Sequence, residues 1–402
     1  MGSIEASELP MEARVKDLVE KSQKISMSDS TSRRELLDVA QRIVHELETP
    51  MEAIYRMVIV QPVLYFTVRI GIELGLFDLM AKEESHPRSS AHLAGLLGVD
   101  PILLGRLLKN MAANDFISET GPDAYDLTPA SRSLTMASYR DGFPFSQDIL
   151  LPGLIKMPQF LAESRYANPQ NITDTPFQLG HSTTRTFFDY LARHPEQIGQ
   201  FNNYMGMYAQ DRPRWLDPGN FPVREILGEG ASTEPDAALL VDVGGGKGHD
   251  LVTFKKTYGD LPGRLVLQDL AGAIQQAGSL PDGIESAVYD FFTPQPVNGA
   301  RAYYFHSVLH GWPDVKCLEI LKNITAAMKP GYSKLLINEI VIPNVGADRM
   351  NTSLDLVMMS VVAAEERTHG NWARLLNQAG LRIVKLWSFG VGTESVIEAE
   401  LI

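Results

Sequence analysis

Hydrophobic residues in the first part of the chain recur at helical spacing. One helix is predicted from Thr31 to Pro50, and a second from Met51 to Ile72, where apolar residues lie nearly all round the helix. We expect such a helix to be buried on more than one side, which favours a dimer surface over packing within one subunit. Residues 1–30 are polar, and we expect them to be poorly ordered apart from one short amphipathic helix containing Val15, Leu18 and Val19.

Residues 88–135 follow the pattern of a winged helix. A capped helix closes on a glycine, Pro101 begins a second helix, and two short runs at 116–119 and 124–127 form a hairpin. A winged helix that reads DNA needs a basic face, yet this segment holds four basic and five acidic residues, a net charge of −1. We therefore expect a structural role, with a ligand-sensing transcriptional regulator as the weaker alternative.

Short apolar runs alternate with helical stretches from about residue 226 onward. This alternation predicts an α/β sheet, and the last two runs form an antiparallel edge because they read as a hairpin. Seven strands are predicted, over residues 239–243, 264–267, 285–289, 302–305, 334–337, 381–388 and 394–398.

A glycine-rich turn joins the first of these strands to the helix that follows it. The segment is Val241–Asp250, VDVGGGKGHD, and its glycines let the backbone turn sharply and approach a ligand where a Cβ would collide. A strand, a glycine turn and a helix N-terminus form the usual nucleotide-type site of a doubly wound sheet. An ordinary tight turn between strand and helix is the alternative.

The second predicted strand ends in Asp269, 21 residues beyond Gly248, where a ribose diol would need an acceptor. The third glycine of the turn falls one position earlier than in the dinucleotide fingerprint, and no basic residue stands beside Asp269 to favour a 2′-phosphate. A ribose-bearing ligand without a required pyrophosphate fits best. This favours S-adenosylmethionine over NAD.

Length and charge narrow the class of protein. The chain has 402 residues and a net charge of −13, which opposes nucleic acid or an anionic membrane as a partner. The single cysteine, Cys317, excludes an internal disulfide framework and suits a reducing compartment. The apolar run Met57–Tyr65 is too short to span a membrane, and no N-terminal run resembles a signal peptide. We expect a soluble, cytoplasmic protein.

Four regions are predicted. Residues 1–30 form a polar N-terminus, 31–142 a helical and winged-helix dimerisation domain, 143–225 a helical region that lines the substrate pocket and links the domains, and 226–402 the cofactor-binding catalytic domain. The third region is rich in aromatic residues and methionine, among them Phe187 and Met205, and such an apolar wall suits a flat organic substrate. An ordinary core is the alternative for each residue.

A second group of polar residues follows the later strands. Tyr303–Asp314, YYFHSVLHGWPD, comes after the fourth predicted strand, so its side chains emerge at the carboxyl edge of the sheet. Asp290-Phe291 follows the third strand, Glu339 the fifth, and Glu366 comes later in the chain. With the glycine turn, these motifs resemble the small-molecule O-methyltransferases of plants and fungi. The resemblance covers nearly the whole chain.

This resemblance implies a Rossmann-like, seven-stranded methyltransferase sheet, an N-terminal dimerisation domain and a homodimer. It assigns His310 as the general base, with Glu339 and Glu366 bracing its imidazole. A phenol titrates near pH 10, judging by tyrosine, and is a poor nucleophile until its proton is removed. A brace on one ring nitrogen leaves the other free to accept that proton.

The family pattern also implies cofactor contacts. Gly244 would approach the methionine portion, Asp269 the ribose, and Asp290 with Phe291 the adenine, although Asp290 could equally be a surface acid. Further contacts are expected from Asp242, Gly245, Gly246, Leu270, His306 and Trp312.

Two further implications concern the substrate and a metal. Met358 and Met359 resemble residues that grip an aromatic substrate, although they could equally be core. His306 lies four residues before His310, as metal ligands on a helix can, but no HExxH motif or third ligand accompanies them and the family type is metal-free. No metal is expected.

One departure keeps a second activity open. Many relatives have aspartate after the histidine, and here the residue is Gly311. An offshoot of the same fold retains S-adenosylmethionine yet catalyses dehydration and pericyclic reactions, with altered residues at the base position. Retention of His310, Glu339 and Glu366 favours methyl transfer. The expected substrate is a phenol, enol or polyketide-like metabolite, whose identity fold-level analogy cannot supply.

Overall fold

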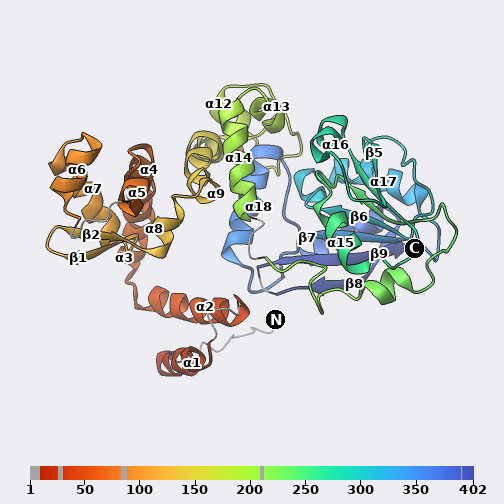
Figure 1. The fold of residues 1–402 in the computed structure, drawn as a ribbon, viewed down its shortest axis with the longest axis horizontal. Coiled ribbons are helices and arrows are strands. Elements are labelled where there is room, and N and C mark those ends of the chain that lie inside the picture. Colours follow the sequence, from red (N-terminus) through yellow and green to blue (C-terminus); the bar gives the residue numbers. More distant parts are fainter. Residues whose placement is uncertain (1–9, 26–29, 83–87, 209–211, 391) are drawn as a thin grey trace. The chain divides into compact units, whose positions relative to one another are not determined.

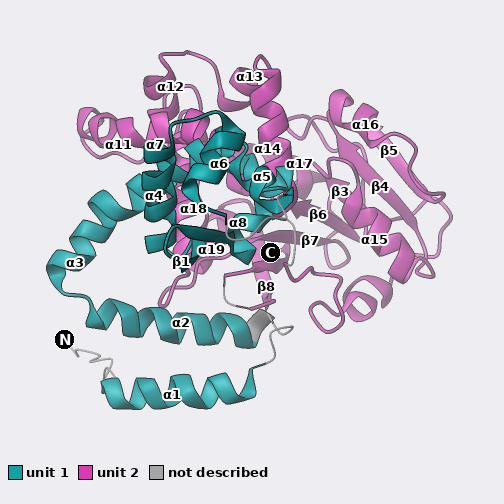
Figure 2. Ribbon diagram, turned by 60° about the vertical axis from the view of Figure 1, so that its left-hand side comes forward, with its two compact units in different colours: residues 1–143 teal, residues 144–402 magenta. Residues whose placement is uncertain are grey.

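The computed structural model describes residues 10–25, 30–82, 88–208, 212–390 and 392–402. It divides into two compact units, residues 1–143 and residues 144–402 (Figure 2). The helical segment predicted to line a pocket, residues 143–225, lies almost wholly within the second unit, together with the sheet.

The first unit is helical with one small hairpin. The helix expected near the N-terminus is present as α1 (Met11–Lys24), although the sequence predicts a poorly ordered segment around it. The other elements of this unit are α2 (Ser30–Leu47), α3 (Pro50–Tyr55), η1 (Arg56–Val60), α4 (Gln61–Glu73), α5 (Leu76–Lys82), α6 (Ser90–Leu97), α7 (Pro101–Ala113), β1 (Ile117–Gly121), β2 (Ala124–Leu127), α8 (Pro129–Ser133) and α9 (Ala137–Arg140).

The predicted helix Met51–Ile72 is α3, η1 and α4 in succession, with one π-helical stretch in the middle. The expectation that it is buried on several sides is wrong within this unit. No residue of α3 or η1, both described in full, is buried, and α4 buries only Thr67, Val68 and Gly71. The apolar residues on these helices are therefore largely exposed.

Local sequence signals explain the helix pair that precedes the hairpin. Ser89 caps α6 by accepting a hydrogen bond from the His92 N–H, and Gly98 ends that helix in the left-handed conformation with φ 69°. Asp100 then caps α7, with Pro101 at the first helical position. The strands β1 and β2 pair antiparallel as predicted.

Helices at the start of the second unit pack with a later helix around an aromatic cluster. The cluster contains Phe145, Phe177 and Phe187 together with Val361 of α18 (Arg349–Val362). The helices of this region are α10 (Gly142–Phe145), η2 (Ser146–Leu150), α11 (Leu151–Glu163), α12 (Pro176–His181), α13 (Phe187–Leu191), α14 (Pro195–Tyr208) and η3 (Arg224–Gly228).

The seven-stranded sheet of the second unit has the order β5-β4-β3-β6-β7-β9-β8. Strands β5 to β9 are labelled in Figure 1, and β3 and β4 in Figure 2. The first five strands are parallel, and β9 runs antiparallel to both β7 and β8, which confirms the predicted α/β sheet with an antiparallel edge. The strands are β3 (Ala238–Val243), β4 (Arg264–Asp269), β5 (Ile284–Val288), β6 (Ala302–His306), β7 (Lys334–Ile340), β8 (Leu381–Ser388) and β9 (Glu394–Leu401).

Two hydrophobic clusters cover the sheet, each drawing alternate residues of the same strands. The helices of this unit's α/β part are α15 (His249–Tyr258), α16 (Ala271–Ala277), α17 (Asp314–Ala327) and α19 (His369–Gln378). Strand β3 pairs with β4 on one side and β6 on the other, so the strand order reverses there. Ligands of such sheets bind outside the carboxyl ends of the strands at this reversal.

Candidate functional site

The glycine turn after β3 has little room for a Cβ at Gly244 and Gly245, and its backbone adopts conformations that favour glycine. Gly244, Gly246 and Gly248 all have positive φ, at 75°, 57° and 75°. A Cβ on Gly244 would lie 2.9 Å from Cγ2 of Val308, and one on Gly245 would collide with the Asp242 carboxylate. The turn therefore presents bare backbone at the carboxyl edge of the sheet.

Asp269, at the end of β4, is held against this turn. Its Oδ2 accepts the Gly246 N–H at 2.9 Å, and its Oδ1 accepts the N–H of the exposed Leu270 at 2.7 Å. Each carboxylate oxygen keeps a further lone pair for another donor. Asp269 is thus oriented to accept hydroxyl groups beside the glycine turn.

Asp242 lies beneath the turn and is 1% exposed. Among the described residues, neither of its carboxylate oxygens has a hydrogen-bond partner. Burial raises the pKa of Asp242 well above its ordinary value, and the neighbouring Asp250 carboxylate adds to the rise. A buried carboxyl group without a donor fits a site whose ligand supplies one.

Aromatic rings lie next to the glycine turn. Phe291 would be 3.8 Å from a Cβ on Gly244, and its ring meets Trp312 edge to face with centroids 5.9 Å apart. Phe292 also packs on Trp312, at 4.9 Å between centroids. Asp290 is exposed and accepts the Phe292 N–H at 3.0 Å. These rings form an apolar wall suited to a flat base.

His310 is bracketed by two buried carboxylates. It lies in η4 (Leu309–Gly311), after β6, and its Nδ1 is 2.7 Å from Oε1 of Glu366 and 3.9 Å from Oε2 of Glu339. The side chain of Glu366 is 0% exposed and that of Glu339 is 1% exposed, whereas that of His310 is 21% exposed. Within the described part of the chain, His310 Nε2 makes no hydrogen bond. The ring is therefore fixed on one side and open on the other.

The two glutamates hold the histidine differently. Oε1 of Glu339 accepts the backbone N–H groups of Val308, Leu309 and His310 at 2.9, 2.9 and 3.3 Å. Glu366 instead contacts the imidazole, and its own backbone N–H donates to Asp355 at 2.9 Å. Glu339 thus fixes the turn, and Glu366 fixes the ring.

The charges in this group raise the proton affinity of the imidazole. Burial alone would lower the pKa of His310, but the negative charges of Glu339 and Glu366 more than offset it and raise the pKa to about 9. Burial raises the pKa of Glu339, and the histidine partly opposes that rise. The arrangement favours an imidazole that accepts and holds a proton.

Arg367 is a further member of the site that the sequence analysis did not single out. Its side chain is fully buried, and its guanidinium donates to the carbonyl oxygens of Leu309 and Trp312 at 3.0 and 2.8 Å and to Asp314 at 2.9 Å. Arg367 thereby fixes the turn that carries His310. Only its place next to Glu366 could have drawn attention to it.

His306 has a different environment from the one predicted. Its Nδ1 lies 2.6 Å from Oδ2 of Asp250 and its Nε2 lies 3.0 Å from Oε2 of Glu394. Both ring nitrogens are thus engaged within the protein, which leaves neither for a cofactor. Asp250 could have been noticed in the first turn after the glycines. Glu394 carries no sequence signal, because 88 residues separate it from His306.

The predicted substrate residues are only partly brought together. Phe187 and Met358 belong to the same aromatic cluster, in which Phe187 is buried and Met358 is half-buried. Met205 on α14 and Met359 on α18 are half-buried but are not members of that cluster. Helix α18 contacts η4, the short helix that contains His310, so part of α18 lies near His310.

His310, Glu339 and Glu366 are also a possible metal-binding group among the described residues. One nitrogen and two carboxylate oxygens lie within 4.8 Å of one another. Oε1 of Glu339 already accepts three N–H groups, and Oε1 of Glu366 is paired with the imidazole. These hydrogen bonds are typical of an acid–base group rather than a metal cage.

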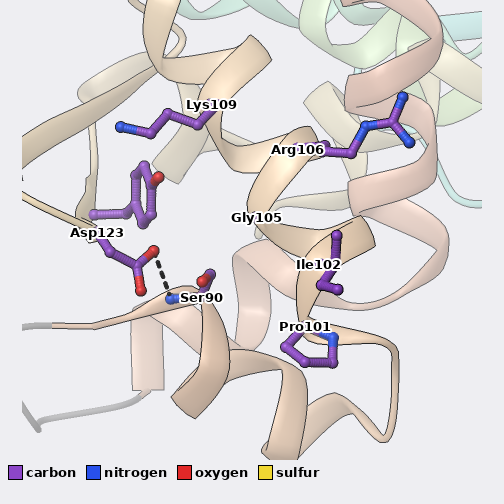
Figure 3. Close-up of a pocket in the computed structure, with 8 residues that line it drawn as sticks. Ser90, Pro101, Ile102, Gly105, Arg106, Lys109 and Asp123 are labelled. Carbon is purple, nitrogen blue, oxygen red and sulfur yellow. Dashed lines mark hydrogen bonds between the residues drawn. The ribbon is translucent and has the colours of Figure 1, made fainter.

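A surface hollow lies in the first unit, which contains none of the predicted site residues (Figure 3). Asp123 at its rim accepts the Ser90 N–H at 3.2 Å. The hollow is lined by Ser90, Pro101, Ile102, Gly105, Arg106, Lys109, Asp123 and Tyr125.

Comparisons with known proteins agree with this geometry. A family model described as an O-methyltransferase domain matches residues 234–382, and one described as an O-methyltransferase dimerisation domain matches residues 63–137. The O-methyltransferase mpaG of Penicillium brevicompactum is 35% identical over 392 residues, which cover 96% of this chain and 98% of that protein.

Solved structures match over nearly the full length. Those described as "A Pericyclic Reaction enzyme" and "The structure of LepI complex with SAM" each align with a TM-score of 0.84 at 33% identity, covering 97% of this chain and 99% of theirs. The sheet, the glycine turn and the matched sequences agree with one another. The chain belongs to the O-methyltransferase family.

Proposed function

We propose that this protein is an S-adenosylmethionine-dependent enzyme that transfers a methyl group to a phenolic or enolic hydroxyl of a small secondary metabolite, with His310 as the general base. The observation that carries the proposal is the pair of buried carboxylates on His310, with Glu366 at 2.7 Å and Glu339 at 3.9 Å. A histidine fixed on one nitrogen and open on the other is arranged to take up a proton.

The residues at the glycine turn fit this cofactor. Asp269 would accept the ribose hydroxyls, and the apolar wall of Phe291 and Trp312 would lie along the adenine. The buried Asp242, without a donor in the described chain, suits a ligand that carries an ammonium group. Support also comes from the solved relative whose description names a complex with SAM.

The chemistry asks little of the protein beyond alignment and proton removal. S-adenosylmethionine supplies a methyl group on a sulfonium, which is already a good leaving group. His310 would take the hydroxyl proton onto its Nε2. Glu366 would hold the Nδ1 proton, and both carboxylates would stabilise the resulting imidazolium.

An apolar, aromatic substrate agrees with the wall that leads to the base. Phe187 and Met358 are proposed to contribute to it through their shared cluster, and Met205 and Met359 through the faces of α14 and α18. Methionine side chains adapt their shape to flat rings. A phenol, an enol or a polyketide-like compound would suit such a site.

The decisive experiment uses S-adenosylmethionine labelled in its methyl group, with a panel of phenols and enols. We expect labelled product from the wild type and a rate lower by roughly 10²–10⁴-fold in His310→Ala, the usual contribution of a general base. Binding of S-adenosylhomocysteine should be unchanged in this variant. Labelled product formed equally well by His310→Ala would contradict the assignment of the base.

A second function is favoured by one observation, the 33% identity to the structure described as a pericyclic reaction enzyme. An enzyme of that kind would bind S-adenosylmethionine and convert its substrate without using the methyl group. The same assay separates the two functions. Substrate conversion with the cofactor unchanged would replace methyl transfer by this alternative.

We further propose a homodimer formed through the N-terminal helices, in the cytoplasm, without nucleic acid or membrane as a partner. The match to a dimerisation domain begins at residue 63, within α4. By length and composition alone, the described segment Pro50–Glu73 could also cross a membrane, as could α6 and α7 if the bent pair were one span. An apolar helix that is covered by a second subunit can have the same length and composition.

A further inference from the structure

His306 ties three elements of the catalytic unit together. It is the last residue of β6, and it contacts Asp250 in the first turn of α15 and Glu394 at the start of β9. The two contacts measure 2.6 Å and 3.0 Å. We call His306, Asp250 and Glu394 the histidine clamp.

The geometry of the clamp fixes the protonation state of the ring. An ionised carboxylate only accepts hydrogen bonds, so a histidine placed between two of them must carry a proton on each nitrogen. Burial alone would lower the pKa of His306, but the bonds to Asp250 and Glu394 raise it to about 11. The same bonds lower the pKa of both carboxyl groups against the opposing effect of burial.

Other groups around the clamp hold its carboxylates. Oδ1 of Asp250 accepts a hydrogen bond from Nε1 of Trp215 at 3.3 Å, and Oε1 of Glu394 accepts one from the Ser307 hydroxyl at 3.4 Å. Asp242 is a second buried carboxyl group near Asp250, and the positive charge of Arg212 helps to lower the pKa of Glu394.

The clamp adjoins the turn that carries the base. Ser307, the next residue, has φ 51°, a left-handed conformation that a serine rarely adopts without support. The backbone N–H groups of the three residues that follow it converge on Glu339, and Arg367 holds the carbonyl of Leu309. The turn is thus anchored by the clamp at its start and by Glu339 and Arg367 at its end.

The same turn touches the glycine loop. A Cβ placed on Gly244 would lie only 2.9 Å from Cγ2 of Val308. Asp250 belongs to α15, the helix that follows the glycine turn. The clamp therefore joins the two walls of the site, the backbone that faces the cofactor and the turn that bears His310.

We propose that His306 is a positioning residue. As a fixed cation between Asp250 and Glu394, it holds the turn that carries His310 in place beside the glycine turn. The inference rests on the proposed methyl transfer for its effect on rate. Its structural part, the charged clamp and the anchored turn, stands independently of the reaction.

The test compares His306→Gln with His306→Lys, and uses His369→Gln, at an exposed position of α19, as the matched control. Glutamine leaves two carboxylates without a cation, whereas lysine restores the charge with several donors. We expect His306→Gln to lower kcat by roughly 10- to 100-fold, the scale of a small misplacement of reacting groups, with KM for the hydroxyl substrate within about twofold. His306→Lys should recover part of that loss, and the control should match the wild type.

Two readouts do not depend on catalysis. Nitrogen NMR should find both ring nitrogens of His306 protonated at pH 9, and amide hydrogen exchange at Val308, Leu309 and His310 should be faster in His306→Gln than in wild type. A neutral His306 at pH 7, or unchanged exchange together with unchanged kcat, would overturn the inference. If the wild type transfers no methyl group while both readouts are as expected, the clamp stands and the proposed reaction fails.

Discussion

Glu339 and Glu366 divide two tasks that a single carboxylate could not perform. Glu339 uses one oxygen to gather three backbone N–H groups, and Glu366 uses one to orient the ring. Both raise the proton affinity of His310, which has a pKa of about 9. The free imidazole is therefore scarce at neutral pH, and this has a measurable consequence.

We expect kcat/KM to rise with pH through about 9, because only the neutral imidazole can act as the base. In Glu366→Gln one of the charges that raises the pKa of His310 is lost, so the rise should move to lower pH while the maximal rate falls. The measurement is a pH–rate profile for both proteins. A rise at the same pH in Glu366→Gln would contradict the role of this charge.

The same titration links to stability with a definite sign. Because the pKa of His310 is raised above an ordinary value of about 6.5, its stabilising effect is complete below pH ~6.5 and is lost as pH rises through about 9. Thermal melting of wild type against His310→Gln between these values should converge as pH rises.

Metal removal tests whether His310, Glu339 and Glu366 bind a metal ion. Since Oε1 of each glutamate is engaged in hydrogen bonds that orient the turn and the imidazole, we expect activity after treatment with EDTA and gel filtration to equal that of the untreated enzyme. Added Mg²⁺ or Zn²⁺ should not increase it. Activity lost on chelation and regained with one ion would show that these residues hold a metal.

At the scale of elements, the glycine turn is the feature whose shape depends most directly on sequence. A Cβ on Gly244 meets Val308 at 2.9 Å, whereas one on Gly246 meets nothing within 4 Å, although both residues have positive φ. Alanine substitutions at these two glycines therefore separate the effect of a steric collision from the effect of backbone strain.

Gly246→Ala is expected to cost roughly 1–2 kcal/mol of stability, from its left-handed conformation alone. Gly244→Ala has the same strain and must also displace Val308, so it should weaken binding of S-adenosylhomocysteine by roughly tenfold or more beyond the control. Titration calorimetry and thermal melting measure both. Equal affinity in the two variants would contradict the importance of this contact.

Periodicity predicted the sheet well because each strand is a local apolar run bounded by turn residues. The glycine turn and Asp269 were predictable because their spacing follows from the alternation of strands and helices, whereas the base region was predicted from its resemblance to the O-methyltransferases. The histidine clamp was not, since Asp250, His306 and Glu394 meet only after β9 pairs beside β7. The exposure of the helix from Met51 to Ile72 within a single subunit was also not predicted, because an apolar pattern does not reveal what covers it.

At the scale of the whole molecule, the exposed apolar surface of α3, η1 and α4 bears most directly on assembly. An exposed apolar surface of this kind is unusual for an isolated subunit in water. Its exposed members are Met51, Ile54, Tyr55, Met57, Val58, Ile59, Val60, Val63, Phe66 and Ile70. It runs without a break into the segment matched by the dimerisation domain.

We expect the wild type to be a dimer by light scattering and Val58→Glu to shift it toward monomer, because a buried charge without a partner is costly. Val345→Glu is the matched control, since Val345 is 90% exposed and lies in the other unit. A monomeric wild type, or co-flotation of the wild type with liposomes of neutral and anionic lipid, would contradict the dimer surface.

The position of β9 has a consequence for the order of folding. Strand β8 pairs with β9, and β9 in turn pairs with β7, so β8 can join the sheet only after the strand that follows it. Glu394 arrives with that same strand. During synthesis, the parallel core through β7 can form while the catalytic edge is still incomplete, because non-local pairing is slow. We therefore expect a late folding intermediate in which the parallel strands are paired but the catalytic site is not yet complete.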